Sequence, residues 1–299
     1  MKCLLLIGSE LANHGIDVST ITCFGVGNGS AIFGIEVFKH KVYVSVERCP
    51  EIFVFSSKDY SLQDKISLPS LTQANYLAVC HKSECLYTID WTKYCISRVN
   101  IGGRNEFTTW STGEAYGGIS VTQEFNILIS SHRSNSLIEY SANGKLLKTI
   151  ALKSVGERIR PWHAVKLSSG MFIISHGSRS PGSVHRVCLF NSVGEICKSF
   201  GSHETAATPD NSSLNGPYHF CVDAKGNTFI ADCNNGRIVI VNESLEYVDE
   251  VKNDLRKPRR VCFDTACSRV YIADNKAVSN KATDGRVVIL KLLYRKINK

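Results

Sequence analysis

The chain has 299 residues, of which 43% are hydrophobic and 21% charged, a composition that excludes a disordered or collagen-like protein and is typical of a globular one. Its formal charge of +8 favours an acidic protein partner or a nucleic acid. The longest apolar run, 3–7, is too short to cross a membrane or to form the apolar core of a signal peptide. We therefore expect no membrane partner and, by default, a cytoplasmic location.

Six similar units follow one another along the chain. They come after an N-terminal extension over 1–18 and a spare strand over 19–25. Each unit has a strand anchored on an aromatic or apolar residue, at Tyr43, Tyr87, Ile127, Phe172, Phe229 and Tyr271. The interval before Phe229 is longer because the polar stretch 202–213 is inserted there. Units of roughly 40–45 residues with four short strands are typical of propeller blades.

The sequence therefore predicts an all-β fold, a six-bladed β-propeller of four-stranded blades that forms one domain over 1–299. Asn143-Gly144 between two apolar strands, a strong hairpin signal, supports this assignment. The last unit ends after its third strand, and an unpaired edge strand would invite aggregation. We therefore expect the strand over 19–25 to complete the last blade and close the ring. The blades are predicted at about 31–68, 75–112, 117–152, 161–201, 216–252 and 258–292.

Two units are clear copies of each other. The segments 216–223 and 228–232 recur as 257–264 and 270–274, and each copy continues into a Gly-Arg strand, at Arg237 and Arg286. These motifs resemble NHL repeats, as in the propeller domain of tripartite-motif proteins, although the first three units match mainly through strand spacing. The arginine recurs as Arg98, Arg186, Arg237 and Arg286, and we expect it to pair with the backbone or with the aspartate of its own blade, such as Asp232 or Asp274.

The resemblance implies recognition and not catalysis, since related propellers bind RNA in some members and proteins in others. It also implies a substrate-recognition module linked to ubiquitination through a partner. Basic and aromatic residues interleave in the loops of blades 4–6, which suits single-stranded RNA or an acidic protein segment. We therefore predict a non-enzymatic, monomeric scaffold without cofactor or DNA partner. Its binding face would comprise Arg158, Arg160, Trp162, His163, Arg179, Tyr218, His219, Arg256, Lys257, Arg259 and Arg260.

A metal-dependent hydrolase or lyase is the alternative, because lactonases and an amidating lyase are related propellers that hold a metal over the channel. His163 and His219 stand two residues after Pro161 and Pro217 and would be the ligands. A catalytic zinc needs three protein ligands, and nothing in the spacing selects His132 or His176 as the third. The equivalent position in blade 6 is Arg260, whose charge opposes a cation, so we expect no metal.

Overall fold

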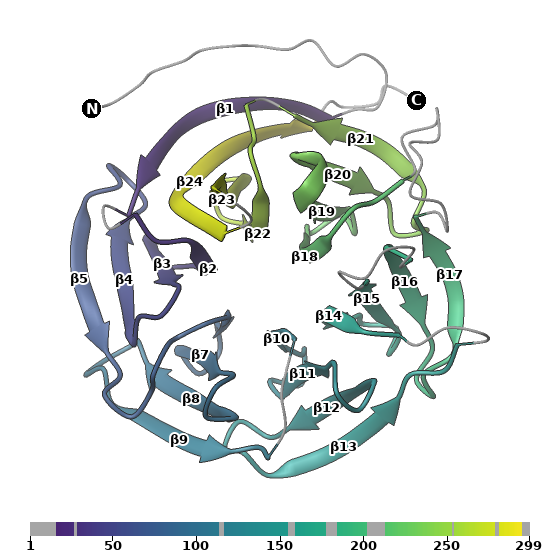
Figure 1. Cartoon of the computed structure of the whole chain (residues 1–299), viewed down its shortest axis with the longest axis horizontal. Coiled ribbons are helices and arrows are strands. Elements are labelled where there is room, and N and C mark those ends of the chain that lie inside the picture. Colours follow the sequence, from purple (N-terminus) through teal and green to yellow (C-terminus); the bar gives the residue numbers. More distant parts are fainter. Residues whose placement is uncertain are drawn as a thin grey trace.

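In a computed structural model, the described residues are 16–26, 29–113, 117–154, 159–177, 184–201, 213–252, 254–278 and 281–294. They form six sheets of four antiparallel strands, arranged around a central axis (Figure 1). The predicted six-bladed β-propeller is confirmed. Within these residues no helix is long and apolar enough to cross a membrane.

The blades follow the chain order, and each one begins at the centre of the ring and ends at its rim. The first three blades consist of β2 (Ile32–Phe38), β3 (Lys41–Val46), β4 (Glu51–Ser56) and β5 (Leu62–Ser67), then β6 (Leu77–Cys80), β7 (Cys85–Asp90), β8 (Cys95–Asn100) and β9 (Phe107–Ser111), then β10 (Ile119–Val121), β11 (Ile127–Ser131), β12 (Ser136–Tyr140) and β13 (Leu146–Ala151). Blades 4 and 5 consist of β14 (Pro161–Lys166), β15 (Phe172–His176), β16 (Arg186–Phe190) and β17 (Ile196–Phe200), then β18 (Pro217–Val222), β19 (Thr228–Asp232), β20 (Arg237–Val241) and β21 (Tyr247–Val251).

Blade 6 is built from both ends of the chain. It contains β22 (Pro258–Asp264), β23 (Arg269–Val278), β24 (Lys281–Tyr294) and, as its outermost strand, β1 (Ile16–Gly25). β1 pairs antiparallel with β24, from Ile16 opposite Tyr294 to Gly25 opposite Arg286. The N-terminal strand therefore closes the ring as predicted, and it starts earlier than the expected residue 19.

The core lies between neighbouring blades. Between blades 6 and 1, for example, Val44 and Phe55 pack with Tyr271 and Ile289, all of them buried. Each such side chain contributes about 1.5–3 kcal/mol when it leaves water. Inner and middle strands such as β3 are buried on both faces, whereas four consecutive residues of the outer strand β5 are exposed. This packing fixes the inner strands that surround the axis.

Candidate binding site at the channel mouth

The inner strands of blades 4, 5 and 6 begin alike, with a proline followed by a β-bulge. In each, the pairing with the second strand skips the residue after the proline. Proline has no amide hydrogen to donate to a neighbouring strand, so within a sheet it is tolerated at places such as the first residue of a strand. The bulge that follows it redirects the side chains. Two tiers of side chains result: an outer tier of bulged residues, Trp162, Tyr218 and Arg259, and an inner tier of the residues that follow them, His163, His219 and Arg260.

In the outer tier, aromatic rings meet edge to face across blades 3, 4 and 5. The Trp162 ring lies 4.4 Å from His132 and 4.9 Å from Tyr218, measured between centroids. The indole Nε1 of Trp162 donates to the carbonyl of Gly177 at 3.0 Å, which fixes the ring. These contacts are of the kind that adds about 0.5–1.5 kcal/mol to aromatic packing.

Arg259 continues the outer tier into blade 1. Its guanidinium carbon lies 5.4 Å from the ring centroid of Tyr218 and 4.2 Å from that of Phe33, both cation–π distances. Phe33 in turn lies 5.6 Å from Trp91 of blade 2. These contacts run around the axis from blade 3 through blades 4, 5, 6 and 1 to blade 2, and we call this rim the channel mouth.

The inner tier places two imidazoles face to face. The rings of His163 and His219 are stacked, with centroids 3.9 Å apart and planes 25° from parallel. The amide of Val261 donates to Nδ1 of His219 at 3.4 Å, whereas Nδ1 of His163 is buried and has no protein partner. Burial, helped by the charge of Arg260, lowers the pKa of His163 to about 3. Burial, together with His163 and Arg260, also holds the pKa of His219 well below 6.5.

Both imidazoles are therefore neutral in the folded protein at pH 7 and resist protonation. Because the unfolded chain takes up these protons first, their contribution to stability is present above pH 6.5 and is lost as the pH falls. We expect this loss to reach about 2 kcal/mol for each histidine that stays neutral at pH 5. Urea unfolding of wild type and of His163→Phe with His219→Phe, at pH 7 and pH 5, measures it.

Wild type and the double variant have to be compared because protonation of Glu36 changes stability with pH in the opposite direction to protonation of the histidines. Burial raises the pKa of Glu36 to about 7, so its protonation stabilises the fold as the pH falls. The double variant should lose less stability than wild type between the two pH values. His40→Phe, at an exposed position, should keep the wild-type difference. An unchanged pH dependence in the double variant would exclude neutral, buried imidazoles.

Arg260 is a buried cation that has no carboxylate partner among the described residues. Its side chain is 2% exposed, its Nη1 donates to the carbonyl of Arg259 at 2.7 Å, and its guanidinium lies 4.1 Å from the ring centroid of Tyr76. Its Nε has no partner, and in the part of the chain described by the structure it forms no ion pair. Burial lowers the pKa of Arg260 to about 10, so it is still charged at pH 7. A buried, uncompensated charge is costly and marks a candidate anion site.

Arg260 ends a basic run over 256–260, and the first two residues of that run, Arg256 and Lys257, have a structural role. Nε of Arg256 lies 3.4 Å from Asp274, and the backbone amides of Arg256 and Lys257 donate to the same carboxylate at 2.9 and 2.8 Å. Arg286 also pairs with Asp274, at 2.9 Å. Asp274 is fully buried and therefore offsets the charge that the sequence alone assigned to an external ligand.

The predicted pairing of the repeated arginines is confirmed in blades 5 and 6. Nε of Arg237 lies 2.8 Å from Asp232, and Nε of Arg286 lies 2.9 Å from Asp274. It is wrong for blade 2, where Arg98 donates to the sulfur of Cys85 at 3.1 Å and to Asn143 at 3.3 Å. The aspartate of that blade, Asp90, instead accepts backbone amides, including that of Thr72.

Of the other predicted site residues, Arg158 and Arg179 lie outside the described residues, and Arg160 is exposed just before β14. Sequence reasoning missed Phe33 and Tyr76. A signal existed for Phe33, because it occupies the bulged position of blade 1 that Trp162 occupies in blade 4. Tyr76 had none, since β6, which begins directly after Tyr76, pairs with β7 without a bulge.

The donors at the channel do not fit a catalytic metal. The stacked rings of His163 and His219 direct their nitrogens along parallel planes, and the charge of Arg260 is close to both. His176 lies away from them, with Nε2 3.4 Å from Cys188. Across the described ranges, no three His, Cys, Asp or Glu side chains gather as a metal would require. A bound metal is therefore not assigned to this site.

Neither a protein-family model nor a curated protein sequence matches the chain. Among solved structures, it is similar to a streptogramin B lyase (12% identity, 93% of this chain and 98% of the other, TM-score 0.63). It is similar also to the virginiamycin B lyase of Staphylococcus aureus (13%, 93% and 100%, TM-score 0.64) and to hydrazine synthase of Kuenenia stuttgartiensis (11%, 92% and 100%, TM-score 0.61). At such low identity the likeness shows the fold alone.

Proposed function

We propose that this protein is a binding propeller that recognises an acidic protein segment at its channel mouth, with a carboxylate of that segment beside Arg260. The observation that supports this is the buried guanidinium of Arg260, which no carboxylate within the described ranges neutralises. A carboxylate would form charge-assisted hydrogen bonds with Arg260 in surroundings from which water is largely excluded. The rim of Trp162, Tyr218 and Arg259 would contact the chain on either side of it.

An acidic protein segment fits this geometry better than single-stranded RNA. RNA needs several exposed cations along its backbone and open aromatic faces on which bases stack. Here Arg256 is paired with Asp274, and Tyr218 is buried with Arg259 over its ring. Of the predicted basic residues that the structure describes, only Arg160 is exposed, so the site offers one deep cation, Arg260, and not a track of exposed ones. RNA binding, the NHL identity of the repeats and the link to ubiquitination stay predictions from the sequence.

A binding measurement with Arg260→Met tests the proposal. We expect glutamate-rich peptides to bind wild type and to lose about tenfold or more in affinity for the variant, since hydrogen bonds to charged groups contribute about 1.5–3 kcal/mol. The matched control is Arg48→Met, which removes the same charge from a side chain that is 84% exposed, in the loop between β3 and β4. Titration calorimetry gives the affinities.

The same titration with oligouridylate separates the two partner classes. Binding of oligouridylate that is stronger than that of the peptides and unaffected by Arg260→Met would contradict the proposal and favour RNA on the surrounding face. Equal losses in Arg260→Met and Arg48→Met would show attraction by net charge alone, and would also contradict a specific site at Arg260.

A further inference from the structure

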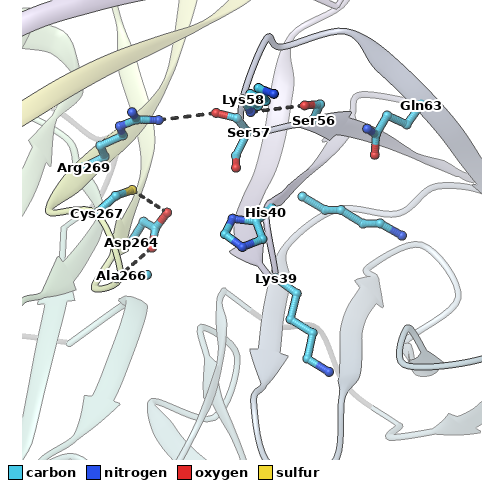
Figure 2. A pocket seen from close by; sticks show the side chains of 11 residues that line it. Lys39, His40, Ser56, Ser57, Lys58, Gln63, Asp264, Ala266, Cys267 and Arg269 are labelled. Carbon is cyan, nitrogen blue, oxygen red and sulfur yellow. Dashed lines mark hydrogen bonds between the residues drawn. The ribbon is translucent and has the colours of Figure 1, made fainter.

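A basic pocket lies where the ring closes, between blades 6 and 1. It has a volume of about 620 Å³ and is formed by the β2–β3 turn, by the residues after β4 and by the β22–β23 turn (Figure 2). These turns follow the ends of β2 and β22 that are opposite to Phe33 and Arg259. The pocket therefore opens on the other face of the propeller from the channel mouth.

The pocket exists because the β2–β3 connection is unusually short. Only Lys39 and His40 separate the two strands of blade 1, whereas four residues, 265–268, separate β22 and β23 in blade 6. Both turn residues have a positive φ, 44° for Lys39 and 64° for His40, as a two-residue hairpin turn requires. Asn-Gly usually fills such a turn, because other residues are strained in this conformation. Here the turn places two basic side chains at the pocket instead.

The charge of the lining is strongly positive. Four cations, Lys39, Lys41, Lys58 and Arg269, stand against one carboxylate, that of Asp264. Asp264 is engaged locally, because it accepts the amide of Ala266 at 3.0 Å and the thiol of Cys267 at 2.9 Å.

The cations differ in how they are held. Nη1 of Arg269 donates across the seam to the carbonyl of Ser57 and to the hydroxyl of Tyr60, both at 3.3 Å. Figure 2 shows Arg269 directed toward Ser57, with Lys39 extending on the other side of His40. Lys39 forms an ion pair with Glu84 of blade 2. Lys41 and Lys58 are exposed, and within the described residues neither has an ion pair. These two lysines are therefore available to a ligand.

We propose that this pocket binds a compact phosphate-bearing anion. A phosphate group carries more than one negative charge and several acceptor oxygens, which suits lysines and an arginine on three sides better than a single carboxylate does. The volume lies in the range of small-molecule sites. Ser56, Ser57 and His40 add polar groups to the lining. A soluble phosphorylated molecule and a phosphorylated lipid headgroup share this chemistry. The proposal is independent of the function assigned to the channel mouth.

The test uses two probes, inorganic pyrophosphate in solution and phosphatidylcholine vesicles that contain phosphatidylinositol bisphosphate. Calorimetry and vesicle sedimentation are carried out with the full chain, with Lys41→Ala plus Lys58→Ala, and with Lys145→Ala plus Lys291→Ala. The second pair is the matched control, since both residues are exposed and neither lines the pocket. All four positions are on the surface, and thermal melts verify that both variants are folded.

Wild type should bind at least one probe saturably, and the Lys41/Lys58 variant should lose about tenfold or more in affinity, while the Lys145/Lys291 variant keeps the wild-type value. Binding of pyrophosphate identifies a soluble ligand as the source, and binding to vesicles alone identifies the lipid headgroup. The proposal is overturned if wild type binds neither probe, or if both double variants weaken binding equally, because the attraction would then follow net charge.

Discussion

Replacing Asp274 with alanine should lower the free energy of unfolding by about 3–5 kcal/mol, as expected when one partner of a buried ion pair is removed. Asp274 is fully buried, pairs with Arg256 and Arg286, and accepts the backbone amides at the start of β22. Without its carboxylate, the arginines lose their counter-charge, and the partly buried backbone amides of Arg256 and Lys257 lose their acceptor. Urea unfolding followed by tryptophan fluorescence measures the change.

Asp284→Ala is the matched control. Its carboxylate is also near Arg256, at 3.9 Å, but its side chain is 68% exposed. An exposed ion pair contributes about 0–1 kcal/mol, so this variant should be close to wild type. Similar stabilities for the two variants would refute the view that Asp274 organises the basic run.

Arg260→Met, unlike Asp274→Ala, should raise the free energy of unfolding, by about 1–3 kcal/mol. Replacing a buried charge with an apolar residue of similar size often leaves stability unchanged or increases it. Methionine has a similar length and can pack against Tyr76, the ring that the guanidinium now covers. The variant removes a desolvated charge for which the described part of the chain supplies no carboxylate. A residue that reduces stability in this way is typical of a binding site.

Arg237→Met provides the comparison for that result. Arg237 is as deeply buried as Arg260, with 5% exposure, but it pairs with Asp232 and Glu250. Its replacement should therefore be destabilising, as for Asp274→Ala. If Arg260→Met destabilises the protein as much as Arg237→Met does, Arg260 is part of the framework and the anion site is wrong.

The fold was accessible from the sequence because a propeller repeats one local pattern. Asn143-Gly144 marks a real hairpin turn, with φ of 83° at Gly144, and the spare N-terminal strand pairs with the incomplete last blade. The start of that strand at Ile16 was missed, although the turn-forming segment 13–15 (Asn-His-Gly) is followed by the alternating segment 16–18 (Ile-Asp-Val), a pattern typical of a strand.

The candidate site could be predicted only in part from the sequence. Arg256, Arg259 and Arg260 are alike in the sequence, yet Arg256 pairs with Asp274, Arg259 covers two rim rings, and Arg260 is buried. The bulge after Pro258 creates this difference, because it turns adjacent side chains in different directions. The basic pocket was out of reach, since it joins residues 39–63 to residues 264–269 only when the ring closes.

The most direct test observes Arg260 itself, through the Nε–H resonance that Arg260→Met removes from the nitrogen-detected NMR spectrum. Adding a glutamate-rich peptide should shift this resonance, because a carboxylate would accept a hydrogen bond from the guanidinium. A resonance that stays in place while the peptide binds elsewhere on the protein would contradict recognition at the channel mouth.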